Sequence, residues 1–159
     1  MDQITQALFL ASRQGNVPVL KEIFELKHDL NVRDEKGYTA LILAVYSGMV
    51  EAAAALLEAG ADVDAADNNG NTALMGACFK GHTDAAGLLL RNRAAVDQVN
   101  GNNGTALMFA AMFNRVDIIK LLVGHDANQE LRDSRGMTAL DHAVQQGNLE
   151  AQLQLGNID

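Results

Sequence analysis

The sequence is poor in the residues that mark several large classes of protein. A single cysteine in 159 residues excludes an internal disulfide, and with it the small secreted folds that disulfides stabilise. Tryptophan is absent, and aromatic residues make up only 4% of the chain. The only proline is Pro18, so no proline-rich linker divides the chain. No apolar run approaches the roughly 20 residues that a membrane-spanning helix needs, and we expect no membrane insertion.

Positive charge is also scarce. The chain has 12 Lys and Arg against 20 Asp and Glu, which gives a net charge of -8. Nucleic-acid binding requires clustered cations, so this balance argues against a nucleic-acid partner. Asp2 stands where a signal peptide would carry positive charge. We therefore expect a cytoplasmic protein, or a periplasmic or secreted one if a signal peptide has been removed.

Internal repetition, in contrast, runs through the whole chain. The residues Thr39, Thr72, Thr105 and Thr138 stand 33 positions apart, and each is followed by Ala-Leu and, three positions later, by another alanine. A glycine column with the same spacing contains Gly15, Gly48, Gly81 and Gly147, with Asn114 in place of the fourth copy's glycine. This period indicates one structural unit copied along the chain.

Each copy is predicted to form a helix, a short turn, a second helix and an extended loop. The threonine is a suitable helix N-cap, and the glycine column suits a left-handed helix end. Val50, Ala53 and Leu56 follow helical spacing in the second helix of one copy. Asn69-Gly70 in the following loop is typical of a hairpin turn.

The period of 33, the Gly-x-Thr-Ala-Leu opening and the run LLEAGADVDAADNNG at 56–70 resemble the ankyrin repeat. This resemblance implies an all-α solenoid of stacked helix-turn-helix units with β-hairpin loops. It covers the whole chain as a single domain, 1–159. The repeats, of which the first and last are expected to be caps, run at about 1–33, 34–66, 67–99, 100–132 and 133–159.

One feature departs from the family pattern, and another marks the C-terminal end of the solenoid. The family's Thr-Pro-Leu-His is Thr-Ala-Leu here, followed by Ile42, Met75, Met108 or Asp141. The resemblance therefore implies that a histidine network bracing neighbouring repeats is absent. In the final copy, Gln152 replaces an apolar column, so we expect a polar outer face there.

The sequence contains no arrangement of residues that indicates a catalytic site. The four histidines are scattered and are expected on solvated turns or helix ends, without a metal role. Asp141 and His142 are adjacent on a helix, so their side chains diverge. Cys78 is expected to pack as a small hydrophobic residue. The sequence thus predicts no catalytic residue, metal or cofactor, and a protein that is not an enzyme.

The resemblance implies a concave face, which is built from the hairpin tips and the exposed side of the first helices. On this sequence the partner-binding positions of that face are Lys36, Tyr38, Tyr46, Ser47, Asn69, Asn71, Phe79, Lys80, Asn102, Met112, Phe113, Arg135, Met137 and Gln145. They include both tyrosines and two phenylalanines. Exposed aromatic rings mark interaction sites, although Phe79 and Phe113 could instead pack between repeats. Phe9 and Phe109 are assigned to the core.

These features predict a non-enzymatic protein-binding module, which acts as an adaptor or as an inhibitor or self-protection factor. Cations at Lys36, Lys80 and Arg135 favour a protein partner with an acidic rim. Without its partner the chain is expected to be a monomer. The alternative is a structural module that forms a homo-oligomer through the aromatic face or a cap.

Overall fold

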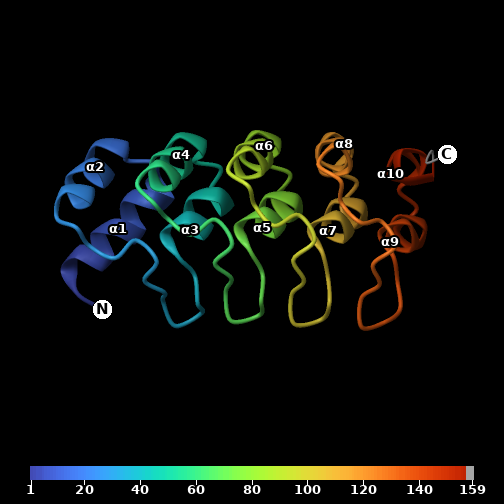
Figure 1. The fold of residues 1–159 in the computed structure, drawn as a ribbon, viewed down its shortest axis with the longest axis horizontal. Helices are drawn as coiled ribbons and strands as arrows, with labels where there is room; N and C mark the ends of the chain where they lie inside the picture. Colours follow the sequence, from blue (N-terminus) through green and yellow to red (C-terminus); the bar gives the residue numbers. More distant parts are fainter. Residues whose placement is uncertain (157–159) are drawn as a thin grey trace.

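The computed structural model describes residues 1–156, and within them it contains ten α-helices and no β-strand. The helices are α1 (Gln3–Gln14), α2 (Val17–Glu25), α3 (Ala40–Tyr46), α4 (Val50–Glu58), α5 (Ala73–Lys80), α6 (Thr83–Arg91), α7 (Ala106–Met112), α8 (Val116–Gly124), α9 (Ala139–Gln146) and α10 (Leu149–Gly156). They stand in two rows, with the odd-numbered helices beside the hairpin loops and the even-numbered helices behind them (Figure 1). The predicted all-α solenoid is confirmed.

The repeated residues begin and end the first helices as the sequence predicts. The hydroxyl oxygen of Thr39 accepts a hydrogen bond from the Ile42 N–H at 3.3 Å, and the three equivalent threonines cap their helices in the same way. Gly81 ends α5 in the left-handed conformation, with φ of 77°. Asn114 takes the same conformation after α7, with φ of 55°, because asparagine tolerates it better than other side chains do.

The core lies between the two rows and between successive repeats. Leu41, Leu74 and Leu107 of the first helices are almost fully buried, and the alanine column behind them is entirely inaccessible. In the second helices, the leucines that are entirely inaccessible are Leu20, Leu56, Leu89 and Leu122. Small alanine side chains allow adjacent helices to approach closely, so each pair packs against the next.

The expected β-hairpins are loops without named strands, and the one isolated bridge in the described chain joins Ala66 and Thr72. A side chain closes each loop instead: Asp67 Oδ1 accepts hydrogen bonds from the N–H groups of Asn69 and Asn71, both at 2.9 Å. Neighbouring loops are joined through their backbones, as when the Ser134 N–H donates to the Asn102 carbonyl at 2.9 Å. The loops therefore form a continuous row beside the odd-numbered helices.

Neighbouring repeats are also braced by the residues that precede three of the second helices, α6, α8 and α10. His82 Nε2 lies 3.3 Å from the Tyr46 carbonyl oxygen, and Arg115 Nη2 donates to the Phe79 carbonyl at 2.9 Å. Asn148 Nδ2 donates to the Met112 carbonyl at 2.8 Å. These side chains supply contacts between repeats in a chain that lacks the family's histidine.

The C-terminal end differs from the polar outer face expected there. Gln152 is half-buried and turns back toward the Ala143 carbonyl, at 3.4 Å. Four apolar side chains are exposed on α9 and α10 instead: Leu140, Val144, Leu149 and Leu153. The leucines equivalent to Leu140 in earlier repeats are buried against the next helix pair, whereas no further pair of the described chain covers this one.

Candidate functional site

The predicted partner-binding positions all have accessible side chains. Nine are exposed, namely Lys36, Ser47, Asn69, Phe79, Lys80, Asn102, Phe113, Arg135 and Gln145. Five are half-buried, namely Tyr38, Tyr46, Asn71, Met112 and Met137. They come from the loops and from the ends of the odd-numbered helices, which lie beside the loops (Figure 1).

Four aromatic rings on this side form a continuous row, which we call the aromatic row. The ring centroids of Tyr38 and Tyr46 are 6.4 Å apart, and those of Tyr46 and Phe79 are 6.3 Å apart. Phe79 meets Phe113 edge-on, with centroids 4.9 Å apart and an interplanar angle of 82°. The row links three successive repeats, because each ring contacts the next along the solenoid.

The two phenylalanines of the row lie at the surface rather than between repeats. Phe79 is 41% exposed and Phe113 is 37% exposed. The edge-on geometry of the pair is one that aromatic quadrupoles favour. Each ring therefore keeps part of its apolar surface in water while a neighbouring ring holds it in place.

The position of the Tyr46 ring depends on the glycine at position 76 of α5. A Cβ atom at Gly76 would lie 2.8 Å from the Tyr46 Cε2 atom, which is too close for two carbon atoms. The absence of a side chain on α5 thus lets the tyrosine ring lie against the helix backbone. Burial raises the pKa of the Tyr46 hydroxyl, assisted by Tyr38 and the Asp67 carboxylate, so the phenol remains neutral.

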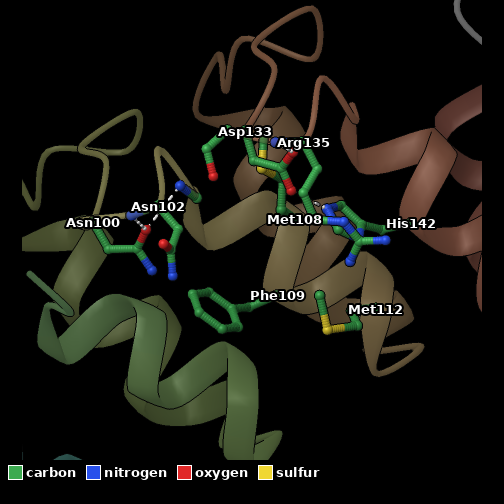
Figure 2. A pocket seen from close by; sticks show the side chains of 10 residues that line it. Asn100, Asn102, Met108, Phe109, Met112, Asp133, Arg135 and His142 are labelled. Carbon is green, nitrogen blue, oxygen red and sulfur yellow. Dashed lines mark hydrogen bonds and ion pairs between the residues drawn. The ribbon is translucent and has the colours of Figure 1, made fainter. Parts of the chain in front are cut away.

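A second feature of the same side is a hollow of about 410 Å³ between the last two loops, which we call the hollow. Its apolar wall consists of Met108, Phe109 and Met112 of α7. Figure 2 shows Asp133 and Arg135 reaching over it from the last loop. Of the predicted residues, the structure brings Asn102, Met112 and Arg135 together here.

The prediction for Phe109 is wrong in part. Of the two phenylalanines predicted to lie in the core, Phe9 is buried, at 3% exposure. Phe109 is only half-buried, and its ring lines the hollow. Phe109 occupies the same position in its repeat as Leu43 and Gly76 do in theirs. This position of the first helix faces the loops, so its side chain is not enclosed between the helices.

His142 is buried, which contradicts the expectation that every histidine lies at a solvated position. It is 3% exposed, and its Nε2 lies 2.7 Å from Asp133 Oδ2. Burial would raise the pKa of Asp133, but hydrogen bonds from the Met137 N–H, His142 and the Arg135 N–H outweigh it and lower that pKa. The pair forms part of the lining of the hollow.

Sequence reasoning missed this pair because the two residues belong to different columns. The sequence nevertheless contained the information. Asp133 occupies the repeat position at which Asp34, Asp67 and Asn100 close the earlier loops. His142 occupies the column of Phe109, which faces that loop. Combining the two columns would have placed the imidazole beside the carboxylate.

Three of the cations on this side of the molecule form no ion pair with an acidic side chain of residues 1–156. Within residues 1–156 the ion pairs are Arg132–Asp141, at 3.8 Å, and His142–Asp133. Lys36, Lys80 and Arg135 form none in this part of the chain. Gln145 stands apart from both the aromatic row and the lining of the hollow.

Other reactive groups are dispersed. Cys78 is fully buried, and burial raises the pKa of its thiol. In residues 1–156, no three His, Cys, Asp or Glu side chains gather as a set of metal ligands. Nor does any helix in that range have the length and apolar content to cross a membrane.

Comparison with known families agrees with the fold. A family model described as ankyrin repeats, in three copies, matches residues 8–100 and 88–156. No curated protein matches the sequence. Ankyrin repeats are generally protein–protein interaction modules and are typically not enzymes. With the repeated helix pairs and this match over almost its full length, the chain belongs to the ankyrin repeat family.

Proposed function

We propose that the protein is a non-enzymatic binding module that holds a partner protein on its concave face and acts as an adaptor or as an inhibitor or self-protection factor. The observation that carries the proposal is the aromatic row, in which Phe79 and Phe113 remain 41% and 37% exposed. Exposed apolar surface is unfavourable in water unless a ligand covers it.

The row is suited to binding because its rings support one another before any partner arrives. Tyr46 lies against Gly76, and Phe113 holds the edge of Phe79. Rings that are already held in place lose less side-chain entropy on association, so more of the interaction energy contributes to affinity. Aromatic residues are also enriched among the residues that dominate interface energetics.

Charge favours an acidic rim on the partner. Lys36 lies two residues before Tyr38 and Lys80 follows Phe79, and neither lysine has an ion-pair partner within residues 1–156. The aspartates that close the loops are engaged by backbone N–H groups, as Asp34 is by Lys36 and Tyr38. The two lysines are therefore available to carboxylates of a partner, which accelerates association and selects the partner.

The test is a paired capture experiment from lysate of the source organism. The baits are the wild-type chain and the variants Phe79→Ala, Phe113→Ala and the double variant. Leu26→Ala is the control, because Leu26 is an exposed apolar residue at the end of α2 in the other row of helices. Circular dichroism establishes that all baits are folded.

We expect a protein that the wild type and Leu26→Ala capture and the double variant loses. Once it is identified, each phenylalanine substitution should weaken its binding by about 2 kcal/mol, within the range of interface hot spots. Equal capture by all baits would place the binding surface elsewhere and overturn the proposal.

A second candidate function is self-association through the C-terminal end. It is favoured by the exposed side chains of Leu140, Val144, Leu149 and Leu153, which form an apolar edge where polar residues were expected. Light scattering over a range of concentrations separates the two functions. A dimer that disappears in Val144→Gln/Leu149→Gln would support self-association, whereas a monomer at all concentrations would exclude it.

A further inference from the structure

The hollow differs from the aromatic row in being bounded by two loops and by residues of α7 and α9, and its polar groups indicate what it holds. We propose that it receives an aromatic side chain of the partner that is flanked by a carboxylate. This inference rests on the proposed function, and it names the chemistry that the partner must present at one place on the concave face.

The apolar wall fits a ring. Phe109 and Met112 project from successive turns of α7 (Figure 2), and Met108 lies behind them as part of the core. Thioether groups interact favourably with aromatic rings and adapt to their shape. The volume of about 410 Å³ lies within the range of pockets that hold small organic groups, so a ring and its adjoining backbone can enter.

Three of the polar side chains around the hollow already have partners. Asn100 Oδ1 accepts from the N–H groups of Asn102 and Gly104, while its Nδ2 donates to Asn71 Oδ1. Asp133 Oδ1 accepts from two backbone N–H groups, and its Oδ2 is bound to His142. These groups shape the hollow but have little capacity left for a ligand.

Three polar side chains retain that capacity. The Arg135 guanidinium, the Asn102 carboxamide and the Ser134 hydroxyl make no side-chain hydrogen bond or ion pair within residues 1–156. All three line the hollow beside the apolar wall. The charged or titratable groups here are Arg135, Asp133 and His142, and the last two are hydrogen-bonded to each other. The free donors are therefore a guanidinium, an amide and a hydroxyl, which together suit a carboxylate.

Two small probes that differ only in charge test the assignment. N-acetylphenylalanine carries a ring and a carboxylate, and N-acetylphenylalaninamide carries the same ring without the charge. Each is titrated at low salt into the ¹⁵N-labelled protein, and NMR shift changes report the site and the affinity. The variants are Arg135→Gln and, as a control that removes one positive charge outside the hollow, Lys120→Gln at an exposed position on α8.

We expect shifts at Asn102, Gly104, Met112 and Arg135, with the acid binding about threefold more tightly than the amide, as for an exposed ion pair. Arg135→Gln should equalise the two probes, and Lys120→Gln should leave the preference intact. Shifts confined to the aromatic row, no shifts at all, equal affinities for the wild type, or a preference that survives Arg135→Gln would each overturn the inference.

The failure of this inference is distinguishable from that of the proposed function. If the probes ignore the hollow while the double phenylalanine variant loses the captured partner, the function stands and the hollow has another role. If the probes bind the hollow as expected but capture is indifferent to both phenylalanines, the binding role of the aromatic row is overturned.

Discussion

The guanidinium of Arg115 donates a hydrogen bond to the backbone carbonyl of Phe79, at 2.9 Å. It lies across Gly81, where an added Cβ would come within 2.9 Å of the Arg115 Cζ atom. The residues before α6 and α8 do not cap their own helices, and their side chains reach back to the preceding repeat instead. A cation at the carbonyl end of a helix is also favoured by the helix dipole.

Arg115→Met is therefore expected to destabilise the fold. Methionine keeps much of the apolar stem but loses the charged donor, and such a bond contributes about 1–2 kcal/mol to the free energy of unfolding. Urea denaturation measures the change. Lys120→Met, at an exposed position on α8, is the control and should have an effect below about 0.5 kcal/mol. Equal midpoints for the two variants would show that the brace contributes nothing.

The contact between Gly76 and Tyr46 predicts a non-additive pair of substitutions. Alanine in place of a helical glycine gains about 1 kcal/mol, but here its Cβ would lie 2.8 Å from the tyrosine ring. We expect Gly76→Ala to lose that gain in the wild type and to recover it in the Tyr46→Ala background. A double-mutant cycle should give a coupling of about 1 kcal/mol. Additive effects would mean that the ring moves aside without loss.

The helices and loops that recur in every repeat could be predicted from the sequence. Contacts of the candidate site could be predicted only where they involve residues that recur in every repeat. Threonine caps and glycine ends recur every 33 residues, so they define the helices directly. Arg115 and His142 each occur once in their column, and their partners, Phe79 and Asp133, are distant or out of register. The 33-residue period predicts where the helices and loops lie. These contacts depend instead on a side chain that differs from the equivalent residues in the other repeats.

The Asp133–His142 pair predicts a loss of stability in acid. The pKa of Asp133 is lower in the folded protein than its ordinary value of 3.8, so folding favours the ionised carboxylate. This contribution is fully present above the ordinary value and is lost as the pH falls through the lowered one. Asn100 shows that asparagine can close such a loop, which makes Asp133→Asn a conservative change.

We expect Asp133→Asn to lower the free energy of unfolding by about 1 kcal/mol at neutral pH. The difference from the wild type should shrink as the pH falls below the ordinary value of 3.8 and through the lowered pKa, where the folded carboxylate takes up its proton. Denaturation at a series of pH values measures it. Asp126→Asn, at an exposed position with a positive φ that asparagine accepts, should show no such trend. A constant difference down to pH 2 would contradict the assignment.

Cys78 predicts a thiol that reacts only when the fold opens. Its side chain is fully buried in α5, and burial raises the pKa of the thiol, so the reactive thiolate is disfavoured. The rate of thiol labelling is measured with a disulfide reagent at pH 8. Given an ordinary domain stability, we expect this rate to be at least about a thousandfold lower for the native protein than for the protein in urea. Rapid labelling of the native protein would show that α5 opens locally.

Phe113 is expected to matter more for binding than for folding. Its ring is 37% exposed and contacts Phe79 edge-on, and such a contact contributes about 0.5–1.5 kcal/mol. Phe113→Ala should therefore lower the free energy of unfolding by about 1 kcal/mol. Leu107→Ala, in the buried column of the same repeat, should lower it by about 2–5 kcal/mol. Urea denaturation of both variants compares the two positions directly. If Phe113→Ala destabilises the protein as much as Leu107→Ala does, its ring serves the core, and the aromatic row loses the member that links it to the fourth repeat.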